Sequence, residues 1–327
     1  MVYTTKIESF DSLTPAWEKL LQNATHNHIF FTPTWQRVWW EHLGRGNEPL
    51  LVSFREGDEL AGVASFMRSG TTISLLGDAD VCDYLDLVTR KGHEDGVCSA
   101  LYDFLLETEW DSLDLVPLRP DSVAMAYFIP LLERKGHAVE KSQIDTSPEA
   151  ALPKDWEDFL ASLSKKDRHE LRRKMRRLES AGEVRHTCTG NPESLMKDIE
   201  DFLALFRASR EDKVTFLTPE RESYFRNLVQ ATLERNLLRL SFLELDGKRV
   251  AANLCFDYDG SIYLYNSGYD PQYYRLAVGL LHKAYCLRSA IASGKARFDF
   301  LRGAEPYKYD LGGKDVPIYR YRVKRQP

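Results

Sequence analysis

The sequence predicts an α/β protein of two similar halves, each with a mixed, mainly antiparallel sheet flanked by helices. Its 327 residues exceed what one hydrophobic core usually accommodates, so two domains are expected. With 43% hydrophobic and 28% charged residues, the composition is typical of a folded globular protein. An internal repeat, in which one order of strands, turns and a helix occurs twice, indicates that the two halves share a topology.

The repeat begins with two strands joined by a tight turn. Residues 51–66 read Leu-Val-Ser-Phe-Arg-Glu-Gly-Asp-Glu-Leu-Ala-Gly-Val-Ala-Ser-Phe, and residues 239–256 contain the similar run Leu-Ser-Phe-Leu-Glu-Leu-Asp-Gly. Apolar strands on either side of an Asp/Gly turn predict a hairpin. A third strand, a helix and an Asp-centred strand follow each hairpin, at 72–77, 95–108 and 113–116 in the first copy and at 262–268, 277–293 and 298–301 in the second. Any α/β protein offers such runs, but the matched order favours a duplication.

A loop-rich segment divides the two halves. Residues 142–154 contain the stretches Asp-Thr-Ser-Pro-Glu and Leu-Pro-Lys, and clusters of Pro, Ser and Asp are typical of loops. The predicted domains are therefore residues 1–145 and residues 150–327.

Composition and charge argue against several classes of protein. A net charge of −5 does not favour nucleic-acid binding by the molecule as a whole. The 5 cysteines are scattered without Cys-x-x-Cys spacing, and the 8 histidines include no close pair of metal-ligand type apart from His26-x-His28. No stretch approaches about 18 consecutive apolar residues, and the N-terminus lacks a basic segment followed by an apolar one. We therefore expect a cytoplasmic protein without a metal.

A strand-to-helix junction at Ala277 and Gly279 is the first candidate site. Small residues at a helix N-terminus let backbone N–H groups approach an anion closely. The helix dipole and the neighbouring Arg275 add attraction for a phosphate. A junction that only packs tightly would contain the same residues.

The second candidate site is the segment Phe-Asp-Phe-Leu-Arg-Gly-Ala-Glu-Pro-Tyr-Lys, which begins at Phe298. Asp is unfavourable in strands, so Asp299 between two phenylalanines indicates a function or a buried partner. Arg302 and Glu305 follow at the strand end, where α/β sheets usually place ligands. The alternative is a set of salt bridges that fixes the end of the strand.

These two segments resemble the acyltransferases of the GNAT superfamily. The repeated order of strands and helix is similar to the acyl-CoA-binding core of that superfamily. Ala277-x-Gly279 matches the end of its Arg/Gln-x-x-Gly-x-Gly/Ala turn, although Tyr274 stands at the Arg/Gln position. The segment from Phe298 resembles the Asp-Phe-x-Arg-Gly-x-Glu-x-Tyr-Lys signature of the CelD/BcsL group of GNAT enzymes. The aromatic helix after Phe30, the Asp-Tyr-Leu-Asp run at Asp83 and the helix after Leu163 also resemble that group.

The resemblance implies a FemAB-like arrangement of two GNAT folds, in which the C-terminal half is an acyltransferase. The implied donor is acyl-CoA with an acetyl or longer chain. The implied acceptor is a small sugar- or amino-acid-like amine, or less favourably a hydroxyl, in polysaccharide or cell-envelope metabolism. The implied residues are Tyr263, Asn266, Arg275, Ala277, Val278 and Gly279 for the donor, Glu305 as base, Tyr265 and Tyr307 as hydrogen-bond donors, and Asp83, Asp299, Arg302 and Lys308 for the acceptor.

A basic run at 165–177 leaves other functions open. Leu163, Leu171, Met175 and Leu178 form a narrow apolar stripe along a segment with a helical pattern. Ser164 is its candidate N-cap, and most other positions are cationic. Such a helix suits the phosphates of a donor, a phosphorylated acceptor, RNA, or only solvent. The first alternative function is therefore a FemAB-like transferase that uses aminoacyl-tRNA. The second is a non-catalytic binding protein derived from a GNAT pair.

Overall fold

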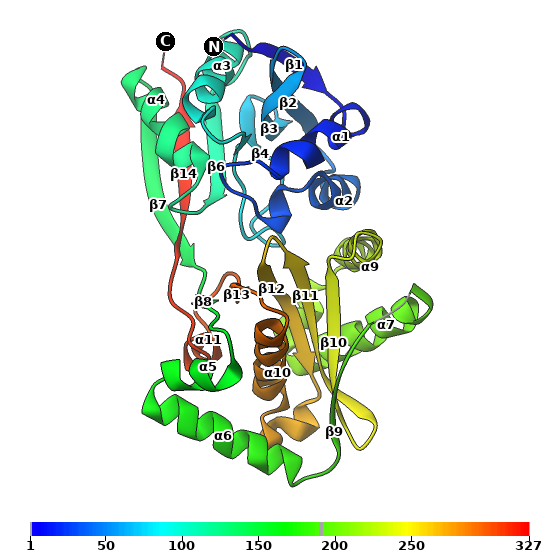
Figure 1. Cartoon of the computed structure of the whole chain (residues 1–327). Helices are drawn as coiled ribbons and strands as arrows, with labels where there is room; N and C mark the ends of the chain where they lie inside the picture. Colours follow the sequence, from blue (N-terminus) through cyan, green and yellow to red (C-terminus); the bar gives the residue numbers. More distant parts are fainter. Residues whose placement is uncertain (1, 190–191, 327) are drawn as a thin grey trace. The chain divides into compact units, whose positions relative to one another are not determined.

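The computed structural model describes residues 2–189 and 192–326 and divides the chain into two units (Figure 1). Unit 1 consists of Met1–Thr146 and Val316–Pro327, and unit 2 of Ser147–Asp315. Unit 2 therefore ends earlier than the predicted domain of residues 150–327. The reason is that β14 (Pro317–Lys324) pairs with two strands of unit 1.

Unit 1 contains a sheet with the strand order β1-β2-β3-β4-β6-β14-β7, and β5 pairs with β3. Helix α1 packs against β3 and α2, and its capping box at Ser9 fixes where it begins. The elements are β1 (Thr4–Glu8), α1 (Phe10–Leu21), η1 (Ile29–Phe31), α2 (Pro33–Leu43), β2 (Glu48–Glu56), β3 (Glu59–Ser69), β4 (Thr72–Leu75), β5 (Val88–Thr89), α3 (Glu94–Leu106), β6 (Ser112–Leu118), the π-helical turn η2 (Ala124–Phe128), α4 (Ile129–Arg134) and β7 (Ala138–Thr146).

Unit 2 contains a second sheet with the strand order β8-β13-β12-β11-β10-β9. Helix α10 packs on β10, β11 and β12, and α7 packs on β11 and β12. The elements are β8 (Glu149–Ala151), α5 (Trp156–Ser162), α6 (Lys165–Glu179), β9 (Val184–Cys188), α7 (Pro192–Ser209), α8 (Glu211–Phe216), α9 (Pro219–Leu233), β10 (Leu238–Leu245), β11 (Lys248–Tyr258), β12 (Ser261–Tyr269), η3 (Pro271–Leu276), α10 (Val278–Ala292), β13 (Arg297–Asp299) and α11 (Pro306–Asp310).

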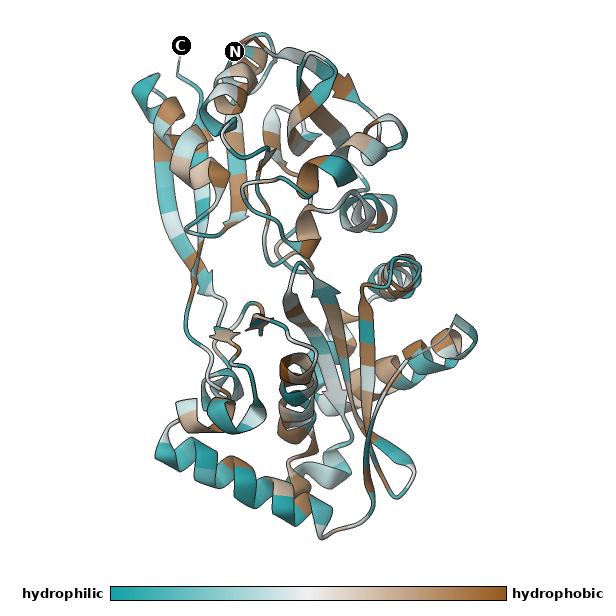
Figure 2. Cartoon of the chain, in the orientation of Figure 1, coloured by the Kyte–Doolittle hydropathy of each residue, from teal (hydrophilic) through white to brown (hydrophobic). Residues whose placement is uncertain are grey.

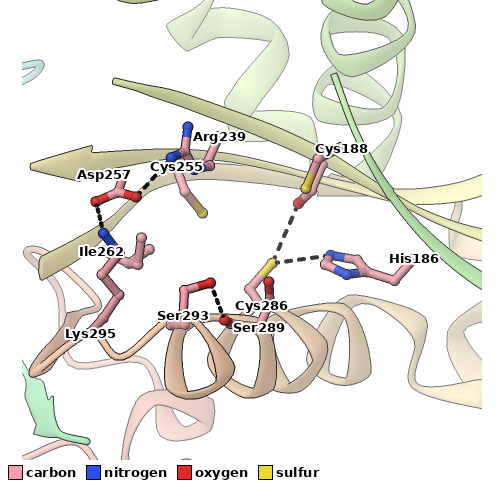
Figure 3. A pocket seen from close by; sticks show the side chains of 12 residues that line it. His186, Cys188, Arg239, Cys255, Asp257, Ile262, Cys286, Ser289, Ser293 and Lys295 are labelled. Carbon is pink, nitrogen blue, oxygen red and sulfur yellow. Dashed lines mark hydrogen bonds and ion pairs between the residues drawn. The ribbon is translucent and has the colours of Figure 1, made fainter. Parts of the chain in front are cut away.

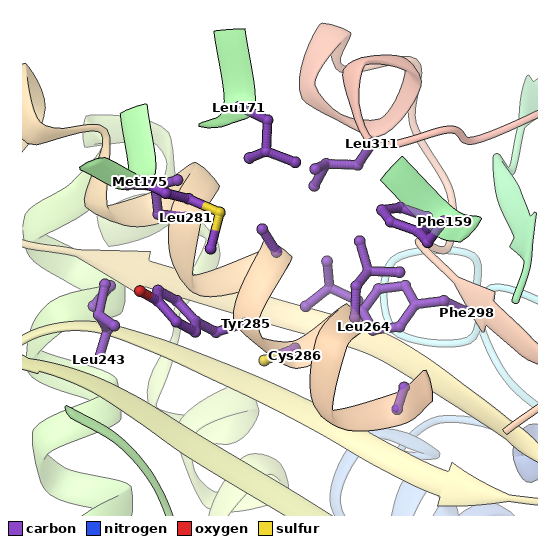
Figure 4. Close-up of a cluster of buried hydrophobic side chains, with 14 of the residues drawn as sticks. Phe159, Leu171, Met175, Leu243, Leu264, Leu281, Tyr285, Cys286, Phe298 and Leu311 are labelled. Carbon is purple, nitrogen blue, oxygen red and sulfur yellow. The ribbon is translucent and has the colours of Figure 1, made fainter. Parts of the chain in front are cut away.

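The core of unit 2 joins α5, α6 and α10 to one face of the sheet (Figure 4). Leu171, Met175 and Leu178 are the buried residues of α6, as the apolar stripe predicts, and Ser164 accepts a hydrogen bond from the backbone N–H of Asp167. The rest of α6 is mostly hydrophilic (Figure 2). Across residues 2–189 and 192–326, every helix falls short of the length or apolarity that a bilayer crossing requires.

The two units repeat one topology, which confirms the predicted duplication. In each unit a hairpin (β2–β3 or β10–β11) is followed by an antiparallel third strand (β4 or β12). A helix (α3 or α10) then leads to a strand (β6 or β13) that pairs in parallel with the third. In the second hairpin both turn residues have positive φ, 49° at Asp246 and 77° at Gly247, as a tight hairpin turn requires.

One glycine sets how closely α7 approaches the sheet of unit 2. A Cβ atom added to Gly268 of β12 would lie 2.3 Å from the backbone nitrogen of Phe206 and 2.4 Å from the carbonyl carbon of Leu205. Both atoms belong to the backbone of α7, so no side-chain rotation relieves the contact. The glycine therefore permits a helix-to-strand approach that every other residue type obstructs.

We predict that Gly268→Ala lowers the free energy of unfolding by roughly 1–3 kcal/mol, because the added methyl group forces α7 away from β12. Chemical denaturation followed by circular dichroism measures the change. Ser267→Ala on the same strand is the matched control and should leave the stability close to that of the wild type. Equal stability of the two variants would contradict the close approach.

Candidate functional site

Strands β12 and β13 pair only at the start of β12 and then diverge. Their parallel register covers Ser261↔Arg297, Ile262↔Phe298 and Tyr263↔Asp299. From Leu264 to Tyr269, β12 pairs with β11 on its other side. The edge of β12 toward β13 has no strand partner over this stretch within the described residues, while the carbonyl oxygen of Ser267 accepts a hydrogen bond from Nζ of Lys213.

A bulge marks the point of divergence. The register between β11 and β12 passes from Leu254↔Asn266 to Cys255↔Leu264, which leaves Tyr265 as the extra residue. Bulges of this kind bend a strand and are common beside active sites. The bend gives β12 a direction that β13 does not follow.

The N-terminus of α10 lies directly after this strand and η3. Ala277 has φ 55° and its side chain provides no cap, so backbone N–H groups form the start of the helix. Val278 is buried and offers its backbone only. A Cβ atom on Gly279 would lie 3.1 Å from Cδ1 of Tyr269, so this residue brings the helix terminus against the end of β12. Arg275 is exposed at the same junction.

Lys308 holds the loop that follows β13. Its ammonium, 2% exposed, donates to the carbonyl oxygens of Leu301 at 2.7 Å, Arg302 at 2.7 Å and Gly303 at 2.9 Å. It also lies 2.9 Å from a carboxylate oxygen of Glu305. Because an ammonium has three donors, this group has no donor left for an acceptor molecule. The structure thus gives Lys308 a positioning role in place of the predicted contact with substrate.

Asp299 also stabilises the loop that follows β13. It is fully buried, and its Oδ1 accepts a hydrogen bond from the backbone N–H of Leu301 at 2.9 Å. Leu301 has φ 60°, a left-handed conformation that needs such a constraint. Asp299 therefore fixes the turn after β13. This agrees with the alternative in the sequence analysis that the charged residues of this segment fix the end of the strand. Arg302 is half-buried in the same loop.

Glu305 and Tyr307 are the candidate acid–base groups beyond this loop. Burial raises the pKa of Glu305, but the positive charge of Lys308 outweighs it and holds the pKa below its ordinary value. The carboxyl is therefore ionised at neutral pH and 43% of the side chain is exposed. Burial and the charge of Glu305 raise the pKa of Tyr307 well above its usual range. The site thus pairs a proton acceptor with a phenol that stays protonated.

Two lysines that the sequence did not single out border these groups. Lys283 of α10 is 6% exposed, donates to the carbonyl oxygen of Gly279 at 3.1 Å and lies 4.7 Å from the centre of the Tyr307 ring. Lys213 of α8 donates to the carbonyl oxygen of Ser267 on β12 at 2.5 Å. A lysine in the mainly apolar first half of α10 was the available signal for Lys283. Only tertiary packing brings Lys213 to β12.

Burial lowers the pKa of both lysines to about 8. The positive charge of Lys283 is the second cause at Lys213, and the negative charge of Glu305 acts in the opposite direction at both. The two ammonium groups and the carboxylate thus form one electrostatic cluster beside the diverging strands.

The remaining predicted residues lie on β12 and in unit 1. Tyr263 is fully buried and offers its backbone only, and Asn266 is half-buried on β12. The ring of Tyr265 packs against Phe225 of α9 at 5.7 Å and Phe256 of β11 at 5.5 Å, so the described contacts do not bring it to Glu305. Asp83 belongs to unit 1, where it is half-buried between β4 and β5.

Residues 165–309 match the family model described as an acetyltransferase (GNAT) domain. The matched residues all lie in unit 2. The match spans the diverging strands, the N-terminus of α10 and the Glu305 loop. The comparison with curated proteins finds no match for the chain.

Solved structures show that the GNAT fold occurs in tandem. The crystal structure of FemX is similar with a TM-score of 0.66, 11% identity and coverage of 97% of this chain and 96% of that one. L-PGS from Bacillus licheniformis has a TM-score of 0.59, 14% identity and coverage of 95% and 91%. A tandem GNAT protein from the clavulanic acid biosynthesis pathway has a TM-score of 0.55, 12% identity and coverage of 100% of both chains. At these identities the likeness establishes the shared fold.

We predict that the stability of the protein rises between pH 8 and pH 10 through Lys283. Its pKa is about 8 in the folded protein and 10.5 in the reference state, so the unfolded chain binds more protons in this window and stability increases with pH. The contribution over the window is about 2 kcal/mol.

The measurement is the free energy of unfolding at both pH values in the wild type and in Lys283→Met. The variant should lose this part of the increase, and the exposed-lysine control Lys197→Met should retain it. Identical pH dependence in the wild type and Lys283→Met would contradict the lowered pKa.

Proposed function

We propose that the GNAT domain of unit 2 is an acyltransferase that moves an acyl group from acyl-CoA to an amine of a sugar- or amino-acid-like acceptor. A hydroxyl acceptor is the less favoured variant. The observation that carries the proposal is the divergence of β12 from β13 beside the α10 N-terminus, with Glu305 on the adjoining loop and Tyr307 in the first turn of α11. The CelD/BcsL resemblance favours a role in polysaccharide or cell-envelope metabolism, and the scattered cysteines and N-terminal sequence favour a cytoplasmic setting.

We assign the donor to the place where β12 and β13 diverge. The unpaired edge of β12 offers amide groups to an extended chain such as pantetheine. The backbone N–H groups at Val278 and Gly279, with the helix dipole and Arg275, suit the pyrophosphate of coenzyme A. Helix α6 packs against both η3 and α10, so its cations add positive potential near this terminus.

The corresponding helix terminus of unit 1 is unsuited to a phosphate. Glu94 and Asp95 occupy the first turn of α3, where their charges oppose an anion. Asp86 is also committed to structure, because it accepts hydrogen bonds from the backbone N–H groups of Val123 and Ala124 at 2.7 and 2.9 Å. We therefore assign the donor to unit 2 and a substrate-shaping role, with Asp83, to unit 1.

The chemistry follows from the protonation states at the site. Glu305, ionised at neutral pH, accepts a proton from the acceptor amine, directly or through water. The amine nitrogen forms a bond to the thioester carbonyl carbon, and the carbonyl oxygen becomes an oxyanion. Tyr307, still protonated, donates a hydrogen bond to the oxyanion or to the departing thiolate. Collapse of the intermediate breaks the carbon–sulfur bond and yields the amide and free coenzyme A.

Lys213 and Lys283 supply positive charge to the same reaction. With a pKa of about 8, each remains largely protonated at neutral pH. Their partial burial strengthens their interaction with a developing negative charge relative to an exposed ammonium. They also favour acceptors that carry an anionic group.

A second candidate donor is aminoacyl-tRNA, as in the FemAB-like alternative. The observation that favours it is the exposed cationic surface of α6, where Lys165, Lys166, Arg176 and Arg177 have no acidic partner among the described residues. Such a surface would neutralise several tRNA phosphates at once. The affinity of the protein for tRNA would then fall steeply as the salt concentration rises.

A thermal-shift titration with acetyl-CoA, longer acyl-CoAs and free coenzyme A distinguishes an acyl-CoA donor from an aminoacyl-tRNA donor. A ligand that binds only the folded state raises the melting temperature with its concentration. We expect a dose-dependent rise with at least one acyl-CoA. No rise with any of them, combined with salt-dependent tRNA binding, would support the second donor, and no rise with either ligand would indicate a binding protein without this activity.

We predict that Glu305→Gln lowers turnover about 10²–10⁴-fold, the usual contribution of a positioned proton acceptor. The dissociation constant for acyl-CoA should change little, because the substitution keeps the shape of the side chain. Steady-state kinetics with the acceptor and a separate binding titration measure the two effects. Unchanged turnover would remove Glu305 as the base.

We predict that Gly279→Trp weakens acyl-CoA binding at least tenfold. A Cβ atom at this position already lies 3.1 Å from Tyr269, so an indole ring must enter the space before the helix terminus. Isothermal titration with acyl-CoA measures the change. Ser289→Trp, on the same helix away from its N-terminus, is the control, and equal affinities in the two variants would contradict the proposed phosphate site.

A further inference from the structure

A second group of reactive side chains lies where β9 meets α10. A pocket of about 180 Å³ opens here, and its walls include His186 and Cys188 from β9 and Cys286 from α10 (Figure 3). The acyl-transfer site proposed above uses none of these side chains. β9 and α10 are far apart in the sequence, so only the fold brings the side chains of the two elements together.

Three of the side chains form a compact set of donor atoms. His186, His282 and Cys286 each offer one nitrogen or sulfur atom, and these atoms lie within 4.8 Å of one another. Nε2 of His186 is 3.8 Å from Sγ of Cys286, and Figure 3 shows the two side chains pointing toward each other. His282 and Cys286 stand four residues apart on α10, a spacing that places both on one face of the helix.

From this geometry we infer a binding site for a zinc ion, with His186, His282 and Cys286 as protein ligands. Two imidazoles and a thiolate are preferred donors for Zn²⁺. Tetrahedral coordination with bonds of about 2.0–2.3 Å places ligand atoms roughly 3.5 Å apart. The His186–Cys286 pair is already close to that separation, and the remaining contraction is about 1 Å, within reach of side-chain rotation.

The surroundings of the cluster are those of a metal site. Sγ of Cys286 lies 3.3 Å from Nδ2 of Asn253 and 3.4 Å from Oγ of Ser241. The same Ser241 hydroxyl is 3.1 Å from Nε2 of His282, so one group orients two of the ligands. Nδ1 of His282 is fully buried and has no hydrogen-bond partner in the described part of the chain.

Two cations and one carboxylate lie in the pocket wall. Asp257 pairs with Arg239 at 2.9 Å and with Lys295 at 2.6 Å, so its carboxylate offsets one of the two positive charges. The pocket also provides an entry path and room for a fourth ligand. Cys188 lies two residues after His186 on β9 and also lines the pocket.

Titration of the metal-free protein with Co²⁺, followed by Zn²⁺, tests the inference. Thiolate coordination to Co²⁺ produces a charge-transfer absorption, which we expect to saturate at one equivalent and to disappear when Zn²⁺ displaces the cobalt. His186→Gln, at a half-exposed strand position, should lower the affinity for Zn²⁺ at least tenfold. Cys286→Ser should abolish the absorption band.

Cys98→Ser is the matched control, since it removes a buried free thiol from unit 1. It should bind both metals like the wild type. Absence of the band in the wild type, or equal Zn²⁺ affinity in the wild type and His186→Gln, would overturn the site. Circular dichroism of His186→Gln confirms that this comparison is made on folded protein. Because absorption is measured without acyl donor, the result is independent of the acyltransferase proposal.

Discussion

The ammonium of Lys308 is the interaction on which the candidate site depends. Three carbonyl oxygens in the loop after β13 point to one buried positive charge, and Glu305 completes its surroundings. Without that charge the carbonyl dipoles would face one another without compensation. The same buried charge therefore fixes the loop after β13 and the position of Glu305 beside it.

The two units show how one topology supports different chemistry. Both have a third strand that pairs briefly with the strand after the helix. The first turn of α3 is acidic, whereas α10 starts at Ala277 with small residues and no acidic side chain. A difference of a few residues at equivalent helix termini therefore separates a surface that repels anions from one that suits them, while the packing of each sheet is unaffected.

The fold was more predictable from the sequence than the site. Hairpins, helices and the repeat depend on local periodicity and turn residues, which the sequence displays directly. The proposed donor turn at Gly279 and the Glu305 segment are likewise short motifs in the sequence. The sequence did not identify Lys213 and Lys283 as site residues. Their lowered pKa values arise from burial by segments that are distant in the sequence. For the same reason Lys308, predicted as a substrate ligand, proved to be occupied by carbonyl groups that no local pattern reveals.

The return of β14 to unit 1 has a consequence for biosynthesis. This strand lies between β6 and β7 and pairs with both. A ribosome that has released residues 1–146 has therefore produced two strand edges whose partner is not yet made. Those edges stay open while all of unit 2 is synthesised, a period in which a chaperone or unit 2 folding itself must keep them from pairing elsewhere. The order of translation thus makes the first unit to emerge the last to complete its sheet.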